Sequence, residues 1–220
     1  MTATAKCDRR WVIDVARIGI LGGTFNPPHL GHLICAQAAQ TALGLDAVVF
    51  VPVGQPPHKQ ITGDPGHELR FELCCRATES NDRFEVSRAE IDRPGKSYTV
   101  DTLNALHLEH PEDQLTFIVG ADMAASLSSW REPERLLSVA SFAVGQRAGH
   151  GATAEKIAAA VAEIPGASER MEFFKMGRID ISSSEIRDRV ARGLPIRYLV
   201  PDGVCDLISE KGLYREGITR

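Results

Sequence analysis

The sequence lacks an apolar stretch of about 18 residues, which is the length expected of a membrane-spanning helix. Asp14 and Arg17 also interrupt the apolar residues near the N-terminus, so a secretory signal is not predicted. Internal repeats and low-complexity segments are missing as well. We therefore expect neither a membrane-spanning protein nor a secreted one.

Cysteine is scarce, and basic residues are not in excess. The five cysteines are an odd number without a Cys-x-x-Cys pair, so neither a disulfide framework nor a zinc site is expected, and a reducing cytoplasm fits. The chain has 25 Lys and Arg residues and 29 Asp and Glu residues, which gives a net charge of -4. This charge disfavours a general nucleic-acid-binding surface but allows a local basic pocket for a small anion.

The composition that is present suits a globular protein. Hydrophobic residues make up 43% of the 220 residues and charged residues 25%, which allows one sizeable core and at most two small domains. We expect an N-terminal extension at residues 1–16 and a main domain at residues 17–214, with a C-terminal subregion at about 181–214. Residues 215–220 would form a tail.

The most informative stretch is residues 18–32, which read IGILGGTFNPPHLGH. A short apolar run is followed by a glycine pair, an Asn-Pro-Pro break and a helix expected from about Leu30 to Leu43, with Pro28 at its opening. Glycines let the backbone approach a ligand, and the N–H groups and dipole of the helix face the same point, which suits a phosphate. His29 and His32 would lie on the first turn and donate hydrogen bonds to that phosphate.

Strand-like and helix-like segments alternate along the rest of the chain. The apolar run at residues 47–53 has the composition of a strand buried on both faces of a parallel sheet. The alternation predicts an α/β fold with a right-handed, doubly wound parallel sheet and a small helical C-terminal part. In such sheets ligands bind beyond the carboxyl ends of the strands. Further strands are expected at residues 17–21, 84–86, 115–119, 141–145 and 172–176, and helices at 66–80, 132–139, 155–163, 185–192, one from within 96–103 to about 109, and one within 199–214.

A second motif, Ile181–Arg187, reads ISSSEIR, and its serines are natural caps for a following helix. This motif and the His29-x-Gly-His32 stretch together resemble the two signatures of the HxGH nucleotidyltransferases, relatives of the class I aminoacyl-tRNA synthetases. Ser184 stands where many relatives carry threonine, which keeps the hydroxyl. The resemblance implies a Rossmann-like nucleotidyltransferase fold.

Further segments resemble the bacterial nicotinate mononucleotide adenylyltransferases, over about residues 17–214. Two departures stand out: Asn26 replaces the aspartate of many members, and no proline follows Arg147. The segments that carry this resemblance are Pro56-Pro57-His58-Lys59, Ser97-Tyr98-Thr99-x-Asp101-Thr102-Leu103, Gly120-x-Asp122 with Trp130, Val200-Pro201, and Gly212-Leu213-Tyr214.

The reaction that the resemblance implies joins nicotinate mononucleotide to ATP and gives deamido-NAD and pyrophosphate. The 5′-phosphate of the mononucleotide attacks the α-phosphorus of ATP, so no protein nucleophile or general base is required. Catalysis would come from holding two anions in line and stabilising the developing charge. Mg²⁺ would arrive with ATP, because the sequence offers no carboxylate cluster for a metal cage.

The resemblance also assigns roles to individual residues. Trp130 could stack on the cationic pyridine ring or pack in the core, Thr99 could bind the nicotinate carboxylate or cap a helix, and Asp122 could bind the ribose or form a turn. The expected catalytic residues are His29, His32 and Arg187; the expected ATP-binding residues are Gly22, Gly23, Thr24, Phe25, Gly120, Asp122, Ser183 and Ser184; and the expected mononucleotide-binding residues are Lys59, Tyr98, Thr99, Trp130 and Arg147.

Other functions stay open. An adenylyltransferase acting on phosphopantetheine or a cytidylyltransferase would use the same fold and phosphate site, and a non-catalytic nucleotide sensor could be built on it. A tRNA-binding protein is disfavoured by the acidic charge. The sequence leaves open whether the protein forms a homo-oligomer, and whether it prefers nicotinate or nicotinamide mononucleotide.

Overall fold

A computed structural model describes residues 15–57, 61–147 and 152–215 of the chain. Its centre is a six-stranded sheet with the strand order β3-β2-β1-β4-β5-β6, in which every neighbouring pair is parallel. This order confirms the doubly wound parallel sheet that the alternation predicted. The strands are β1 (Arg17–Gly23), β2 (Ala47–Pro52), β3 (Phe84–Val86), β4 (Gln114–Gly120), β5 (Ser141–Arg147) and β6 (Met171–Met176).

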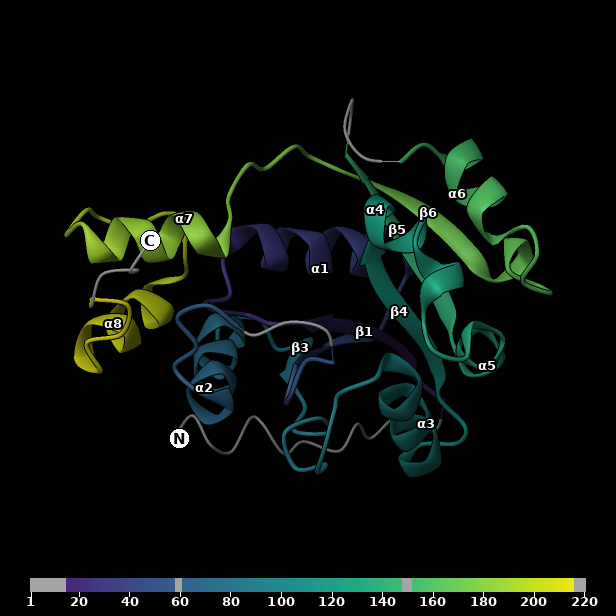
Figure 1. Ribbon diagram of the computed structural model, residues 1–220, viewed down its shortest axis with the longest axis horizontal. Coiled ribbons are helices and arrows are strands. Elements are labelled where there is room, and N and C mark those ends of the chain that lie inside the picture. Colours follow the sequence, from purple (N-terminus) through teal and green to yellow (C-terminus); the bar gives the residue numbers. More distant parts are fainter. Residues whose placement is uncertain (1–14, 58–60, 148–151, 216–220) are drawn as a thin grey trace.

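Helices cover both faces of this sheet (Figure 1). Three short elements were not expected from the sequence, namely α4, η2 and η3, because helices of one turn leave little periodicity to read. The helices are α1 (Leu30–Leu43), α2 (His67–Thr78), α3 (Thr99–Glu109), α4 (Ala121–Ala124), α5 (Pro133–Val139), α6 (Ala154–Val161), α7 (Ser183–Ala191) and α8 (Asp202–Glu210), with 3-10 turns η2 (Leu127–Ser129) and η3 (Ser168–Arg170).

The core is divided by the sheet, because successive side chains of a strand point to opposite faces. Val49 and Phe117 belong to the cluster under α3, α5 and α6. Their neighbours Val48 and Ile118 belong to the cluster under α1 and α2. All six residues of β2 are buried, as the continuous apolar run predicted.

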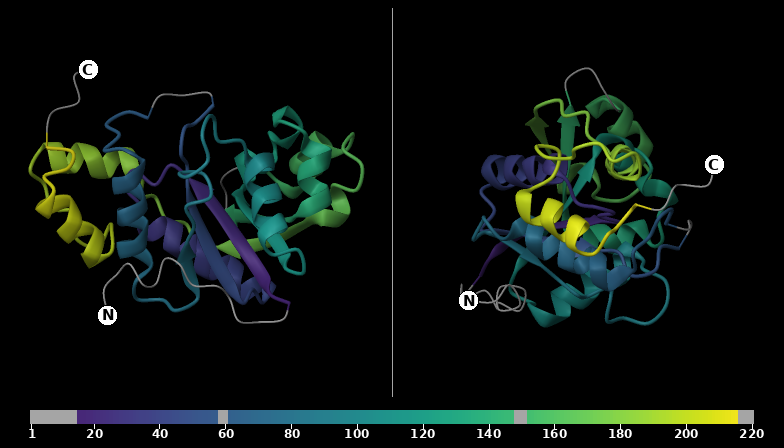
Figure 2. Two further views of the ribbon diagram at one scale, coloured as in Figure 1. Left: turned by 90° about the horizontal axis from the view of Figure 1, so that it is seen from below. Right: turned by 90° about the vertical axis from the view of Figure 1, so that its left-hand side faces the viewer.

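A third cluster attaches the C-terminal helices to α2. Leu73 and Ala77 of α2 pack with Ile186 of α7 and with Val204 and Leu207 of α8. The C-terminal helices therefore lie beside α2, while α5 and α6 lie at the other end of the molecule (Figures 1 and 2). This packing brings the second sequence motif back to the region of the first.

The two neighbouring cysteines of α2, Cys74 and Cys75, differ in their bonding. Cys74 is fully buried in the second cluster. Cys75 is disulfide-bonded. This differs from the expectation that the protein has no disulfide framework, and it is possible because an odd number of cysteines still allows one bond.

Among the described residues, no helix is both long and apolar enough to cross a membrane.

Candidate active site

The site lies where the strand order of the sheet reverses, between β1 and β4. The crossover from β1 leads to β2 on one side, whereas β4 continues to β5 on the other. At such a switch point the carboxyl ends of the two strands open a crevice. Gly22 and Gly23 end β1 and Gly120 ends β4, so three of the expected ATP-binding residues border this crevice.

The turn from β1 to α1 is shaped by Phe25. Its backbone has a positive φ of 49°, and its ring is buried against Phe50, with ring centroids 5.6 Å apart. A Cβ atom on Gly23 would lie only 2.9 Å from the same ring, so glycine is required there. The side chain of Phe25 is therefore a core group, and only its backbone is placed to border the crevice.

His29 and His32 pack closely against each other at the start of α1, with their ring planes inclined by 31°. His29 is the N-cap residue and is 8% exposed, and the two ring centroids are 3.8 Å apart. Gly31 permits this arrangement, because a Cβ atom there would lie 3.0 Å from the His29 ring. Pro28 precedes the cap rather than opening the helix, because His29 occupies the cap position.

One hydrogen bond within this pair determines which ring nitrogen of neutral His32 carries the proton. The backbone N–H of His29 donates to Nδ1 of His32 over 3.2 Å. Nδ1 is thus an acceptor, and the neutral imidazole must carry its proton on Nε2. The bond closes the first turn in the manner of a capping box. His32 is therefore arranged to present an N–H group from the first turn of α1, close to the positive end of that helix.

Hydrogen bonds connect the second motif, Ile181–Arg187, to the turn that precedes α1. The Ser183 hydroxyl donates to the carbonyl of Pro27 over 2.8 Å, and Nη1 of Arg187 donates to the carbonyl of Asn26 over 2.7 Å. Nη2 of Arg187 donates to the Ser184 hydroxyl over 3.3 Å. Ser182, one of the serines expected as a cap, caps α7 by accepting from Glu185 N–H, and Ser183 and Ser184 begin the helix. The N-terminus of α7 is thereby docked on the turn that leads into α1.

Arg187 holds this turn and also retains hydrogen-bonding capacity. Its side chain is buried, and its Nε atom has no partner among the described residues. A buried guanidinium carries a fixed positive charge, and the group favours anions such as a phosphate oxygen. The expected role of Arg187 toward phosphate therefore remains a prediction, while its contact with Asn26 is a structural role that the motif did not reveal.

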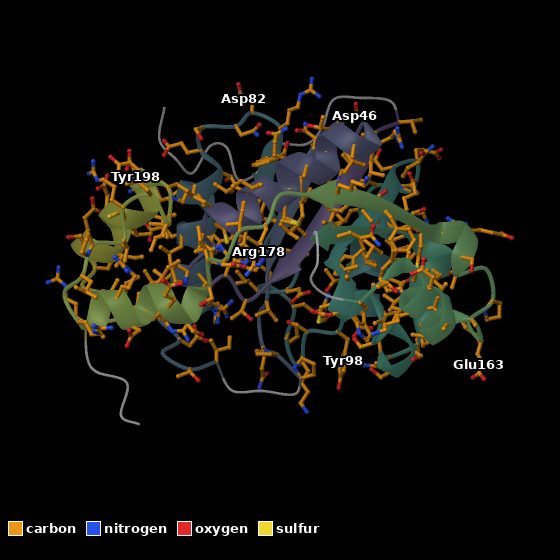
Figure 3. The ribbon with its side chains drawn as sticks, turned by 90° about the horizontal axis from the view of Figure 1, so that it is seen from above. Asp46, Asp82, Tyr98, Glu163, Arg178 and Tyr198 are labelled. Carbon is orange, nitrogen blue, oxygen red and sulfur yellow. The ribbon has the colours of Figure 1, made fainter. Side chains whose placement is uncertain are left out.

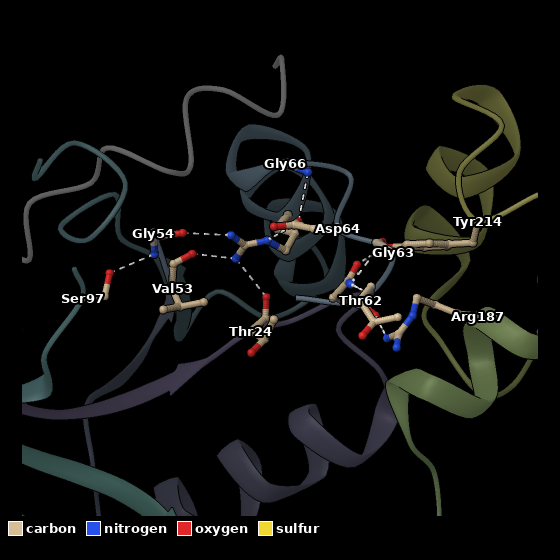
Figure 4. Close-up of polar contacts among 12 residues, drawn as sticks. Thr24, Val53, Gly54, Thr62, Gly63, Asp64, Gly66, Ser97, Arg187 and Tyr214 are labelled. Carbon is tan, nitrogen blue, oxygen red and sulfur yellow. Dashed lines mark hydrogen bonds and ion pairs between the residues drawn. The ribbon is translucent and has the colours of Figure 1, made fainter. Parts of the chain in front are cut away.

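Asn26 joins the turn to the C-terminal segment, and its partners Thr62, Gly63 and Tyr214 are labelled in Figure 4. Its amide donates to the carbonyls of Thr62 and Gly63 over 3.0 and 3.3 Å, and its oxygen accepts from the Tyr214 hydroxyl over 2.7 Å. Burial raises the pKa of the Tyr214 hydroxyl, which therefore remains a proton donor. Asparagine suits this position because it donates and accepts at once, which an ionised aspartate could not do.

The residue that sequence reasoning missed is Arg70 of α2. Its side chain is fully buried, and its Nε pairs with Asp64 Oδ1 over 2.9 Å. Nη1 donates to the carbonyls of Thr24 and Val53 over 3.1 and 2.6 Å, and Nη2 to that of Gly54 over 3.3 Å. Arg70 thus joins the turns after β1 and β2, and its acceptors Thr24, Val53 and Gly54 are labelled in Figure 4.

A signal for Arg70 was present in the sequence. Arg70 shares one helical face with Leu73 and Ala77, at spacings of three and seven residues. Both of those residues are buried. An arginine on the apolar face of a helix needs buried acceptors, so this spacing could have indicated its position.

A pocket of about 560 Å³ lies where α3 begins and η2 ends, with one wall residue from α5. Tyr98, the N-cap residue of α3, is at the edge of the molecule opposite Asp46 and Asp82, which precede β2 and β3 (Figure 3). The pocket therefore opens at the carboxyl ends of the strands. Its wall consists of Pro57, Ser97, Tyr98, Thr99, Val100, Met123, Ser129, Trp130, Arg131 and Leu136.

Trp130 and Thr99 are both part of this wall. The Trp130 ring packs edge-on against Phe117 and Phe142, with centroids 6.1 and 6.4 Å away, and its Nε1–H donates to the Ser126 hydroxyl over 3.1 Å. Trp130 is thus anchored in the core and is half-buried at the pocket. Thr99 follows the cap of α3 rather than forming it, so the capping explanation does not apply to it.

The remaining expected residues lie around the crevice or cannot be placed. Asp122 is exposed after β4, where its carboxylate accepts from the backbone N–H of Ala152 over 3.2 Å. Lys59 lies outside the described residues, and the side chain of Arg147 does too, although its backbone ends β5. Within the described part of the chain, no three His, Cys, Asp or Glu side chains are grouped to hold a metal ion.

Fold and site together define an α/β protein with a crevice at the switch point of a doubly wound sheet, where the N-terminus of α1 is suited to a phosphate. The chain belongs to the cytidylyltransferase-like family, whose model matches residues 20–189, and within it to the nicotinate-nucleotide adenylyltransferases. A protein of Leifsonia xyli named "Probable nicotinate-nucleotide adenylyltransferase" is 44% identical over 199 residues, which cover 90% of this chain and 94% of that protein. A Mycolicibacterium vanbaalenii protein of the same name is 42% identical, with 90% and 92% covered.

Solved structures support the same fold. The Plasmodium falciparum nicotinic acid mononucleotide adenylyltransferase complexed with NaAD superimposes with a TM-score of 0.72 at 20% identity. The superposition covers 92% of this chain and 98% of that one. At this level of identity the likeness concerns the arrangement of the elements.

Proposed function

We propose that this protein transfers the adenylyl group of ATP to nicotinate mononucleotide, in the cytoplasm, as a step of NAD biosynthesis. Two observations carry the proposal: the His29–His32 pair at the N-terminus of α1, and a separate pocket walled by Trp130. The first feature suits phosphates and the second suits a flat cationic ring. The relatives that share 42–44% of their residues carry the name of this activity.

The chemistry needs binding rather than a protein nucleophile. A 5′-phosphate oxygen of the mononucleotide forms a bond to the α-phosphorus of ATP, and the bond from that phosphorus to the α,β-bridging oxygen breaks. Pyrophosphate leaves with the electron pair, and Mg²⁺ carried on the triphosphate offsets part of its charge. The protein must hold both anions in line and stabilise negative charge in the transition state.

The described residues can meet this requirement from two helices. The Nε2–H of His32 would donate to the phosphate oxygens on which charge develops, with His29 beside it. The N-terminus of α7, with the Ser183 and Ser184 hydroxyls, would bring a second helix dipole to the same region. The backbone from Gly22 to Phe25, together with Gly120 and Asp122, would bind the adenosine part.

Pyrophosphate release tests this proposal. The protein is mixed with Mg·ATP and, separately, with nicotinate mononucleotide, nicotinamide mononucleotide or phosphopantetheine. We expect rapid release with nicotinate mononucleotide and formation of deamido-NAD. Release with phosphopantetheine alone would keep the mechanism and overturn the substrate, and ATP binding without release would favour a nucleotide sensor.

Substitution of Trp130 with alanine should raise the KM for the mononucleotide roughly 2- to 30-fold, because stacking of a cation on an indole is worth about 0.5–2 kcal/mol. The KM for ATP should change much less, since the pocket wall is separate from the histidine pair. Steady-state kinetics with each substrate varied in turn measures both values.

The control for this experiment is Trp130→Phe, which keeps an aromatic face against Phe117 and Phe142. We expect a KM rise of only a few-fold in this variant. An equal rise of both KM values in Trp130→Ala would instead mean that the loss of core packing, and not of stacking, is responsible.

A further inference from the structure

We propose that Arg131 selects the acid over the amide, so that nicotinate mononucleotide is preferred to nicotinamide mononucleotide. The proposal rests on the function proposed above for the identity of the ligand. Its basis is the positive charge of the Arg131 guanidinium in the pocket wall, a residue that the sequence analysis did not assign to the site. Arg131 follows Trp130 directly and lines the same pocket.

Arg131 is the sole charged side chain among the described residues that form the pocket wall. Its other members are apolar or neutral polar residues, with Ser97, Thr99 and Ser129 supplying hydroxyl groups. A nicotinate carboxylate is an anion at neutral pH, whereas the amide of nicotinamide has no net charge. Within the wall, Arg131 therefore attracts the carboxylate and not the neutral amide, although Asp101 and Glu132, which pair with it from outside the wall, offset part of this attraction.

Neighbouring groups hold the guanidinium in this wall. Its central carbon lies 4.6 Å from the centroid of the Tyr98 ring, a distance typical of cation–π contacts. Asp101 and Glu132 approach it at 3.7 and 3.3 Å, and neither of them is part of the pocket wall. Because the 3.7 Å contact is longer than a hydrogen bond, the ion pairs orient the group without using all of its donors.

The geometry also indicates which end of the mononucleotide Arg131 would meet. The reacting phosphate must lie at His29 and His32, on the side of the sheet covered by α1. The pocket wall packs on the other cluster, with Tyr98 and Trp130 against the residues under α3 and α5. A mononucleotide that spans the crevice therefore places its pyridine ring, and not its phosphate, beside Arg131.

The test compares Arg131→Gln with the wild-type protein. We expect kcat/KM for nicotinate mononucleotide to fall about tenfold, which corresponds to about 1.4 kcal/mol, while kcat/KM for nicotinamide mononucleotide stays within twofold. Raised salt should reduce the preference of the wild-type protein for the acid but not that of the variant, because Arg131 is 50% exposed and its charge is screened. A merely structural role would not produce this salt dependence.

Arg135→Gln is the matched control. Arg135 pairs with the same Glu132 at 3.2 Å and is 56% exposed, but it is not part of the pocket wall. It should leave the ratio of the two kcat/KM values unchanged. Arg131→Lys keeps the charge and should retain most of the preference for the acid.

Calorimetric binding of each mononucleotide separates this proposal from the proposed function. Preferential binding of the acid that is lost in Arg131→Gln supports Arg131 even if no pyrophosphate is released, in which case only the proposed reaction fails. Equal weakening of both mononucleotides in Arg131→Gln overturns the proposal, since it would place the charge at a shared group. An unchanged acid preference, or no binding of either mononucleotide to the wild-type protein, overturns it too.

Discussion

Turnover is expected to fall about 10²–10³-fold when His32 is replaced by alanine, by comparison with the removal of one donor that stabilises transition-state charge. His32 accepts the His29 backbone N–H at Nδ1, so its neutral ring carries the proton on Nε2 and can donate it in a hydrogen bond to phosphate. Single-turnover pyrophosphate release at saturating ATP measures the loss directly. A decrease of less than fivefold in a folded variant would contradict this role.

Two further variants separate chemistry from folding. His32→Gln keeps an acceptor at the third position of the helix, which is the residue type that capping boxes use. We expect it to recover the thermal stability lost by His32→Ala but not the rate; recovery of both would show that the cap, and not the imidazole, matters. His110→Ala, at the end of α3 on the far side of the sheet, should leave turnover within twofold.

Replacing Arg70 with methionine should lower the free energy of unfolding by about 3–5 kcal/mol, because it leaves three part-buried backbone carbonyls without their donor and removes the partner of Asp64, whose side chain is 30% exposed. Arg70 is fully buried and bonds Asp64 and three backbone carbonyls. For a chain of this size the melting temperature should fall by roughly 6–20 °C. Differential scanning calorimetry or urea unfolding would measure the loss.

Two comparison variants test this prediction: one replaces another arginine of α2, and the other replaces Arg70 itself with lysine. Arg76→Met, in the last turn of α2, removes a half-buried arginine and should cost less than about 1 kcal/mol. Arg70→Lys keeps the charge but cannot reach all of the acceptors, so we expect an intermediate loss. A loss below about 1 kcal/mol for Arg70→Met would mean that water replaces the guanidinium.

Arg70 also connects the two parts of the site. The turn at Gly54, which accepts from Arg70, donates its own N–H to the Ser97 hydroxyl over 3.2 Å, and Ser97 belongs to the pocket wall. The same guanidinium holds the Thr24 carbonyl on the crevice side. One buried side chain thus sets the distance between the proposed ATP and mononucleotide subsites.

The sequence indicated the candidate site because the signals for it are local. The run of buried residues in β2, the glycines after β1 and the histidines at the start of α1 each depend on neighbours within a few positions. The doubly wound sheet followed from the alternation of such segments. Short elements such as η2 and α4 were missed for the same reason, because one turn carries too little periodic pattern.

Only the tertiary structure decided which side chains hold the site together. The hydrogen bond from Arg187 to Asn26 joins residues 161 positions apart, and the bond from Tyr214 to Asn26 joins residues 188 positions apart. Burial makes such bonds strong and their loss costly, but nothing in the local pattern states which partner will be near. Hydrophobic period and turn chemistry determine the elements and their order, whereas the partners of buried polar groups depend on how those elements pack.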